Sequence, residues 1–255
     1  MAVLDIKGVR IGEGRTKTIV SMMAENAKDL VAEQEKVMSS AADIVEWRAD
    51  YFKDAVVSDA YAGTCFSISE TLDRPFIFTL RTLQQGGKGD VWPVDYETIL
   101  EAVISSGEPN IVDIELWMGA ERISRLVKLA HEHGVRVIVS HHDFEKTPSE
   151  EEMVNILLVE AELGADIPKL AVMSKSNQET HSLMRATSLA RAQVDVPLIT
   201  MAMGTAGTNS RLSGEVFGSA TTFCALGRAS APGQVELSQA LPVLEAIHRT
   251  VVAGS

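Results

Sequence analysis

Eight short apolar segments recur along the chain at intervals of about 30 residues, and this recurrence limits the fold more than any other feature. They cover residues 18–22, 43–47, 76–80, 111–115, 135–140, 167–172, 198–201 and 221–226. Apolar positions at three- and four-residue spacing predict helices in most of the gaps, at 27–39, 94–105, 120–133, 149–163, 178–193 and 237–252. Strands that are apolar on both faces are typical of a parallel sheet covered by helices.

Eight strand–helix units in 255 residues predict an α/β protein with a (β/α)8 barrel. We expect residues 1–255 to form one barrel domain, because no low-complexity stretch or long linker divides the chain. The alternative is an open doubly wound sheet, which usually has a glycine-rich turn after its first strand, and SMMA at 21–24 is not one. Residues 3–13 alternate apolar and polar around Lys7-Gly8, which predicts an N-terminal hairpin that closes the barrel bottom.

The charge and cysteine content restrict the partners and the compartment. A net charge of −12 argues against nucleic acid or an anionic membrane as the main partner. No apolar run approaches the roughly 20 residues of a membrane span, and residues 1–14 lack the apolar core of a signal peptide. The two cysteines lie far apart without a motif and indicate reduced thiols. We therefore expect a cytoplasmic protein.

Lys169 lies in the apolar segment DIPKLAVM at 166–173, where a lysine has no obvious solvent to reach. Burial disfavours the ammonium form and lowers the pKa of a lysine, which leaves a neutral amine that can attack a carbonyl and form a Schiff base. The alternatives are a lysine that reaches solvent at a strand edge and one that is neutralised by a buried carboxylate. The segment alone favours neither the nucleophile nor these alternatives.

In a barrel of this type the active site lies at the C-terminal ends of the strands. A protein of net charge −12 places four cationic side chains there, Arg48, Arg81, Lys169 and Arg211. Arginine side chains suit the bidentate binding of carboxylates, so the inventory indicates a small anionic substrate with a carbonyl and hydroxyls. Alternatively, some of them form structural salt bridges with acids at the same strand ends, and we expect this first of Arg48 with Glu46.

The doublet His141-His142 follows the fifth strand and could supply a general base, although a structural role is as common. The sequence leaves open which of the two rings faces the site. The nearby acids lack the ligand spacing of a metal site, and QGGKG at 85–89 lacks the spacing of a phosphate-binding loop. Met201 and Met203 end the seventh strand, where we expect them to line the pocket.

Nine motifs, in order along nearly the whole chain, carry a family resemblance. They are IVS (19–21), EWRAD (46–50), FTLR (78–81), HDF (142–144), IPK (167–169), ITM (199–201), SRL (210–212), GEVFGS (214–219) and SAPGQ (230–234). Together they resemble type I 3-dehydroquinate dehydratase. The resemblance implies Schiff-base dehydration of 3-dehydroquinate to 3-dehydroshikimate in the shikimate pathway of aromatic amino acid biosynthesis, by a hydro-lyase that is commonly a homodimer and needs no metal or organic cofactor.

The resemblance also implies a role for each site residue. Lys169 would form the imine with the substrate ketone, and His142, rather than His141, would remove a proton from C2. Arg211 would hold the substrate carboxylate with the help of Ser230 and Gln234. The remaining residues would order the substrate hydroxyls and the site, and these are Ser21, Glu46, Arg48 and Arg81.

Gln85 departs from the family pattern, which usually has a glutamate at this position. That glutamate is taken to orient the histidine and to raise its basicity, so its absence is expected to lower the pKa of His142 unless Asp143 or Glu145 supplies the charge. The loop at 203–209 also lacks a lysine often found there. Three alternative functions follow: a non-catalytic or impaired relative that binds a cyclic polyol carboxylate, a dehydratase of quinate breakdown, and another lysine-imine lyase.

Overall fold

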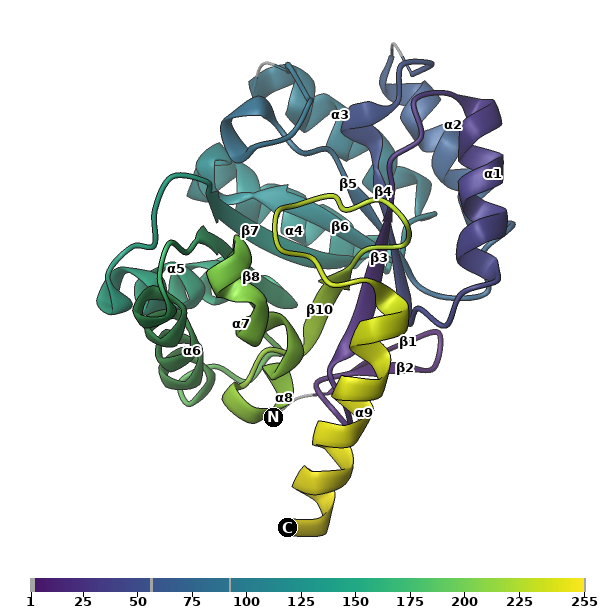
Figure 1. Cartoon of the computed structure of the whole chain (residues 1–255). Helices are drawn as coiled ribbons and strands as arrows, with labels where there is room; N and C mark the ends of the chain where they lie inside the picture. The colour runs from purple at the N-terminus through teal and green to yellow at the C-terminus, as the bar shows by residue number, and fades with distance from the viewer. Residues whose placement is uncertain (1–2, 56, 92, 255) are drawn as a thin grey trace.

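Eight parallel strands wrap into a nearly closed barrel in the computed structural model, which describes residues 3–55, 57–91 and 93–254 (Figure 1). In spatial order the strands are β10 (Thr221–Cys224), β3 (Lys17–Met22), β4 (Ile44–Arg48), β5 (Phe76–Thr79), β6 (Ile111–Glu115), β7 (Arg136–Asp143), β8 (Ile167–Met173) and β9 (Ile199–Met203). Each pairs in parallel with its neighbours in this order, and helices surround them. The predicted (β/α)8 barrel is confirmed.

The seam between β9 and β10 is closed by a side chain instead of a continuous ladder of main-chain hydrogen bonds. The Ser219 hydroxyl accepts from the Thr200 amide at 3.0 Å and lies 3.1 Å from the Thr200 carbonyl, to which it donates. One main-chain bond, from Ala220 to the Leu198 carbonyl at 2.7 Å, completes the contact. Ser219 therefore brings the last strand back to its neighbour and closes the barrel.

The helices around the barrel are α1 (Ala27–Met38), α2 (Ser58–Ser69), α3 (Pro93–Ser106), α4 (Ala120–Glu132), α5 (Glu150–Glu162), α6 (Asn177–Arg191), α7 (Thr208–Leu212), α8 (Gly214–Phe217) and α9 (Leu237–Gly254). All six predicted helices are present, with ends that differ by one or two residues. The helix α2 was not predicted. Its buried face carries Tyr61, Cys65 and Ile68, but the exposed Phe66 weakens the helical spacing of its apolar residues. No described helix is both long and apolar enough to cross a membrane.

The N-terminal hairpin closes the bottom of the barrel, as predicted. Its strands β1 (Leu4–Ile6) and β2 (Val9–Ile11) pair antiparallel, and Ile6 and Ile11 pack against the lowest inward-facing side chains of the barrel strands. Those side chains form a floor made almost entirely of one residue type, Ile19, Ile44, Ile77, Ile111, Ile138, Ile167, Ile199 and Phe223. Seven strands thus place an isoleucine at the same level of the interior.

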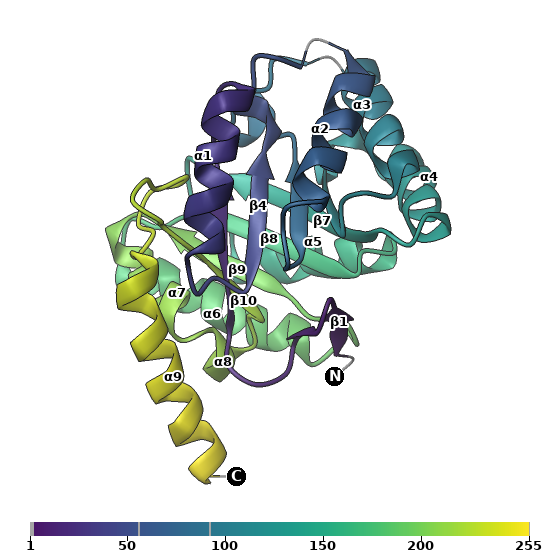
Figure 2. The ribbon, with the colours of Figure 1, turned by 90° about the vertical axis from the view of Figure 1, so that its right-hand side faces the viewer.

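The loop from β10 to α9 lies over the opposite end of the barrel. The Pro232 carbonyl accepts a hydrogen bond from the Gly204 amide at 3.3 Å, and Lys36 of α1 donates to the Leu226 carbonyl at 2.6 Å. These contacts attach the loop to both sides of the barrel mouth. After the loop, α9 leaves the mouth along the outside of the barrel, and its C-terminal end projects beyond the other elements (Figures 1 and 2).

Candidate active site

The polar side chains of the site occupy the two layers directly above the isoleucine floor. Alternation along a strand places every second side chain inside the barrel. Two residues after each floor residue, six strands carry the lower layer, Ser21, Glu46, Thr79, Asp113, Ser140 and Lys169. Two residues further, four strands carry the upper layer, Arg48, Arg81, Glu115 and His142. The strand period itself therefore brings these side chains together.

The two layers and the loops above them enclose a cavity of about 460 Å³. It is lined by nine of the ten predicted site residues, Glu46, Arg48, Arg81, Gln85, His142, Lys169, Arg211, Ser230 and Gln234. The tenth, Ser21, lies directly behind them, with its hydroxyl 2.6 Å from Glu46 and 3.1 Å from Ser230.

Apolar side chains also line the cavity. They are Met201 and Met203, as predicted, together with Ala171, Phe144 and Phe223. Such side chains suit the carbon skeleton of a ring, while the polar groups can fix its substituents. Within the described parts of the chain, no three His, Cys, Asp or Glu side chains form a group that could hold a metal ion.

Lys169 is buried and paired with a buried carboxylate. Its ammonium group lies 2.8 Å from Oδ2 of Asp113 and 4.8 Å from the centre of the Phe223 ring. Only 3% of the residue is exposed. The structure thus combines the burial expected of a nucleophile with the carboxylate partner considered as an alternative, and it leaves the amine on the wall of the cavity.

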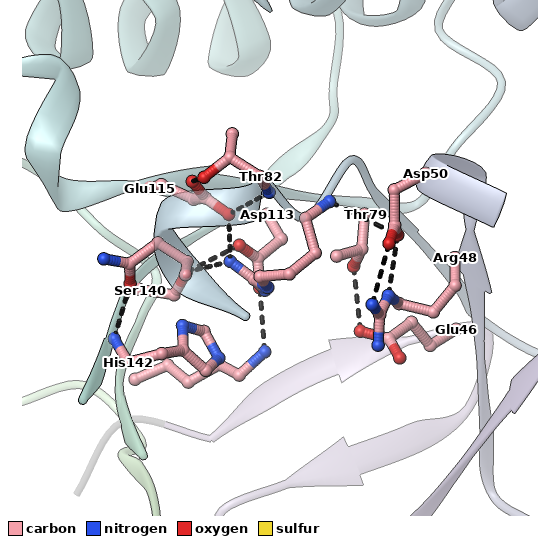
Figure 3. A network of polar contacts seen from close by, with 12 residues as sticks. Glu46, Arg48, Asp50, Thr79, Thr82, Asp113, Glu115, Ser140 and His142 are labelled. Atoms are coloured by element: carbon pink, nitrogen blue, oxygen red, sulfur yellow. Dashed lines mark hydrogen bonds and ion pairs between the residues drawn. The ribbon is translucent and has the colours of Figure 1, made fainter. Parts of the chain in front are cut away.

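Asp113 is the residue that the sequence analysis missed at the centre of the site. It accepts from Lys169, from Arg81 at 2.8 Å and from the Ser140 hydroxyl at 2.6 Å (Figure 3). Burial alone would raise the pKa of Asp113, but the charges of Arg81 and Lys169 outweigh it and hold the pKa well below its usual range. A permanent negative charge therefore lies beside the lysine nitrogen.

The guanidinium of Arg81 is paired with two buried carboxylates. It donates to Asp113 and to Glu115, each at 2.8 Å, and to Ser140 at 3.1 Å. Burial disfavours its charge, but the two carboxylates outweigh that effect and raise the pKa of Arg81 above its usual range. Glu115 also accepts from the Thr82 amide and hydroxyl, which ties the start of the next loop to the network. Arg81 is thus a fixed part of the scaffold of the site.

The expected salt bridge between Arg48 and Glu46 was wrong. Arg48 pairs with Asp50 through two hydrogen bonds, at 2.7 and 2.8 Å (Figure 3). The strand ends at Arg48 and the chain turns into a short 3-10 helix, Ala49–Tyr51, which brings Asp50 back against the guanidinium. Glu46 and Arg48 lie two residues apart in β4 and so share a face of the strand. The turn after β4 offers Asp50 as a closer partner, and Arg48 pairs with Asp50 instead of Glu46.

Glu46 instead accepts hydrogen bonds from hydroxyl groups. The Ser21 hydroxyl donates to it at 2.6 Å and the Thr79 hydroxyl at 2.9 Å. The chain of hydrogen bonds continues from Ser21 to Ser230, and Gln234 donates to the Ser230 hydroxyl at 2.9 Å. The loop after β10 is thereby attached to the strands through the predicted substrate-binding residues.

His142, and not its neighbour His141, faces the cavity. Burial lowers the pKa of His142 well below its usual value, and the charges of Arg81 and Lys169 lower it further. The imidazole is therefore neutral at neutral pH and can accept a proton. Its Nδ1 has no hydrogen-bond partner among the described residues, and its ring stacks on Phe144, with centroids 6.5 Å apart.

Gln85 reaches the main chain of His142 instead of the ring. Its side-chain oxygen accepts from the His142 amide at 2.6 Å (Figure 3). Neither Asp143 nor Glu145 takes the place of the carboxylate expected at position 85. Among the described residues, Asp143 accepts from the amides of the following turn, and no hydrogen bond joins either acid to the imidazole. The negative charge that acts on His142 is that of Asp113, which raises its pKa and only partly offsets the opposing effects.

Replacing Gln85 with glutamate should raise the pKa of His142, since a new carboxylate near the imidazole favours its charged form. The acidic limb of the pH profile of kcat/KM should move upward, and turnover at neutral pH should rise with the basicity of the imidazole. Gln84→Glu is the matched control, because Gln84 lies next to Gln85 but is exposed. A profile and rate that do not change would show that position 85 does not tune the base.

Arg211 is a buried cation without a carboxylate partner. It is 1% exposed, and its only hydrogen bond within the described residues runs to the Pro232 carbonyl at 3.1 Å. Nε and Nη1 have no partner, and burial lowers its pKa to about 10. An unpaired buried charge costs stability, so an anion that enters the cavity would compensate it. Two donors of Arg211 are therefore available to an anionic group in the cavity.

Arg211→Ala should weaken the binding of an anionic ligand by at least about 30-fold, because losing a buried charge contact costs roughly 2 to 5 kcal/mol. The melting temperature should not fall, since the substitution also removes an unpaired buried charge. Arg185→Ala, at an exposed position on α6, is the control. An unchanged KM with a large drop in melting temperature would show that Arg211 is structural.

Comparison with known proteins adds a family and close relatives. The model of the type I 3-dehydroquinase family matches residues 18–251. The 3-dehydroquinate dehydratase of Bacillus subtilis (strain 168) is 42% identical over 251 residues, which cover 98% of each chain. That of Bacillus licheniformis is 41% identical over 248 residues, 96% of this chain and 98% of the relative.

Solved structures are similar to this chain over nearly its whole length. The type I 3-dehydroquinate dehydratase of Clostridium difficile, solved with covalently modified comenic acid, superposes with a TM-score of 0.94 at 37% identity, covering 98% of this chain and 99% of that one. The 3-dehydroquinate dehydratase of Geobacillus kaustophilus HTA426 gives a TM-score of 0.93 at 32% identity, with 97% of both chains covered.

Proposed function

The chain belongs to the type I 3-dehydroquinase family and catalyses the dehydration of 3-dehydroquinate, and we propose that it does so through an imine at Lys169, with His142 as the proton carrier. The observation that carries the mechanism is that one cavity joins a buried amine, a neutral imidazole and an unpaired guanidinium. These are the groups needed to attack a ketone, move a proton and hold a carboxylate. Nothing in the comparisons favours a non-catalytic relative.

The first step forms the imine. Lys169 gives up one proton and attacks the C3 carbonyl carbon of 3-dehydroquinate. That proton and a second one from the attacking nitrogen end on the carbonyl oxygen, which leaves as water. The product is a protonated imine whose positive charge lies where the ammonium was, 2.8 Å from Asp113. Asp113 remains ionised because of Arg81, so it can stabilise this charge without taking the proton.

The second step is the elimination. Neutral His142 removes a proton from C2, and the electron pair moves into the protonated imine, which acts as the electron sink. The resulting enamine expels the C1 hydroxyl, which leaves as water with the proton that His142 returns. Hydrolysis of the imine then releases 3-dehydroshikimate and restores Lys169. The same imidazole serves as base and acid, which requires a pKa low enough to be neutral at the start.

We propose that Arg211 binds the substrate carboxylate, because it lines the cavity and its Nε and Nη1 have no partner among the described residues. Ser230 and Gln234 lie on the loop whose Pro232 carbonyl already contacts Arg211, so they can assist it. Glu46 and Arg48 line the cavity from β4 and can order the hydroxyls of the ring, with Ser21 behind Glu46. Arg81 contributes mainly by fixing Asp113.

The mechanism is tested by incubating the protein with 3-dehydroquinate and borohydride, followed by intact mass measurement and peptide mapping. A reduced adduct on Lys169 supports the imine. Full turnover without any adduct, or an adduct on a different lysine, would contradict it. Turnover measured in the same preparation separates a working enzyme from a protein that only binds the ligand.

We further propose that the protein is a cytoplasmic homodimer that serves aromatic amino acid biosynthesis through the shikimate pathway. The family resemblance supports this setting, and the net charge of −12 supports the absence of nucleic acid and anionic membranes among its partners. Light scattering after size-exclusion chromatography measures the mass in solution and decides between monomer and dimer. Complementation of an auxotrophic strain that lacks this step tests the pathway.

A further inference from the structure

A carboxyl group that the mechanism does not use lies directly behind the proposed nucleophile. Glu160, in the last turn of α5, is 0% exposed, and α5 packs against β8 on the outside of the barrel (Figure 1). Buried apolar side chains, among them Leu157 and Leu170, lie between α5, β8 and the neighbouring helix. A carboxyl group in such surroundings is costly unless it has a specific partner.

The partner of Glu160 is the main chain of Lys169. Its Oε2 accepts from the Lys169 amide at 2.9 Å, while its Oε1 is buried and has no partner among the described residues. The side chain of Lys169 points the other way, into the barrel, to Asp113 at 2.8 Å. The lysine is thus held from both faces of the sheet, by its amide outside the barrel and by its amine inside it.

The charge state of Glu160 suits this arrangement. Burial raises the pKa of Glu160 well above its usual value; the hydrogen bond from Lys169 opposes this shift, and the charge of Asp113 adds to it. Burial therefore favours the uncharged form of this carboxyl group. An uncharged carboxyl oxygen still accepts the hydrogen bond of the Lys169 amide.

We propose that Glu160 is a positioning residue, which fixes the main chain of Lys169 from outside the barrel as a hydrogen-bond acceptor and so directs the amine at the substrate carbonyl. This inference rests on the proposed function, because it takes Lys169 as the nucleophile. Attack on a carbonyl depends steeply on geometry, and a displacement of about 1 Å can cost 100-fold in rate. Glu160 acts through Lys169 and does not touch the substrate.

The test compares the rate of imine formation in single-turnover experiments quenched with borohydride. Glu160→Met has a similar length but no acceptor, and it should form the adduct about tenfold more slowly, with the Kd for 3-dehydroquinate within twofold of the parent. Glu160→Gln keeps a neutral acceptor oxygen and should restore the rate to within about threefold. Glu162→Met is the control, since Glu162 lies on the same helix but is exposed.

Two outcomes would overturn the proposal. A folded Glu160→Met variant that forms the adduct at the parent rate would show that the contact is only structural. A Glu160→Gln variant as slow as Glu160→Met would show that the acceptor oxygen is not what matters. If Glu160→Met does not fold, Glu160→Asp replaces it in the test. Its side chain is shorter by one methylene, so the acceptor oxygen lies further from the Lys169 amide, and this variant must also form the adduct slowly. Absence of any adduct in the parent protein would instead contradict the imine mechanism itself.

Discussion

Lys169→Ala is expected to reduce turnover of 3-dehydroquinate to below roughly one part in 10⁴, by analogy with the removal of covalent nucleophiles elsewhere. The imine is the electron sink for the elimination, and no other lysine lines the described cavity. The borohydride adduct should disappear together with the activity. Steady-state rates and intact mass after trapping measure both effects in the same preparation.

The fold of this variant should remain intact, because β8 is held by its ladders and by its apolar packing. Removing Lys169 takes one cation from Asp113 but leaves Arg81 in place as its partner. Lys175→Ala is the matched control, since Lys175 follows the same strand at an exposed position. Appreciable activity in Lys169→Ala, with the melting temperature of the parent, would remove the imine mechanism.

His142→Ala should slow turnover by about 10² to 10⁴-fold, the usual contribution of a general acid–base group. Because the base and the nucleophile are different residues, the imine should still form, and the trapped adduct should persist while turnover falls. The pH dependence that the imidazole imposes should also disappear. In the parent protein kcat/KM should fall as the pH drops through the lowered pKa of His142, since protonation removes the base.

His141→Ala provides the comparison for this prediction. His141 is half-buried beside the same strand end but does not line the cavity, so its loss should change the rate little. The opposite pattern, with a damaging His141→Ala and a mild His142→Ala, would reverse the assignment of the two rings. Loss of the trapped adduct in His142→Ala would show that His142 is also needed to form the imine.

The barrel and most of the site could be predicted because both follow from the strand period. The isoleucine floor fixes which side chains point inward, and counting two and four residues onward from Ile44 or Ile167 leads to Glu46, Arg48 and Lys169. The same count from Ile111 leads to Asp113. Asp113 lies two residues before the end of its strand, so strand ends alone do not indicate it, whereas the count from the floor does.

The partners of these side chains could not be predicted, because they depend on short turns after the strands. Arg48 pairs with Asp50 only because a 3-10 turn follows β4. Gln85 reaches a main-chain amide because of the path of its loop, where Gly86 has a positive φ and a Cβ would overlap the ring of Phe144. Sequence spacing indicates which residues meet in one region, whereas turn geometry decides which atoms bond.

The isoleucine floor also bears on how this barrel can change during evolution or redesign. It closes the barrel interior below the site, and the hairpin covers it from the other side. Effects of substitutions at sites more than about 7 to 10 Å apart usually add. Stabilising changes beneath the floor should therefore combine freely with new side chains at the mouth. Substitutions at the mouth can then change the substrate preference of the barrel while its melting temperature is kept.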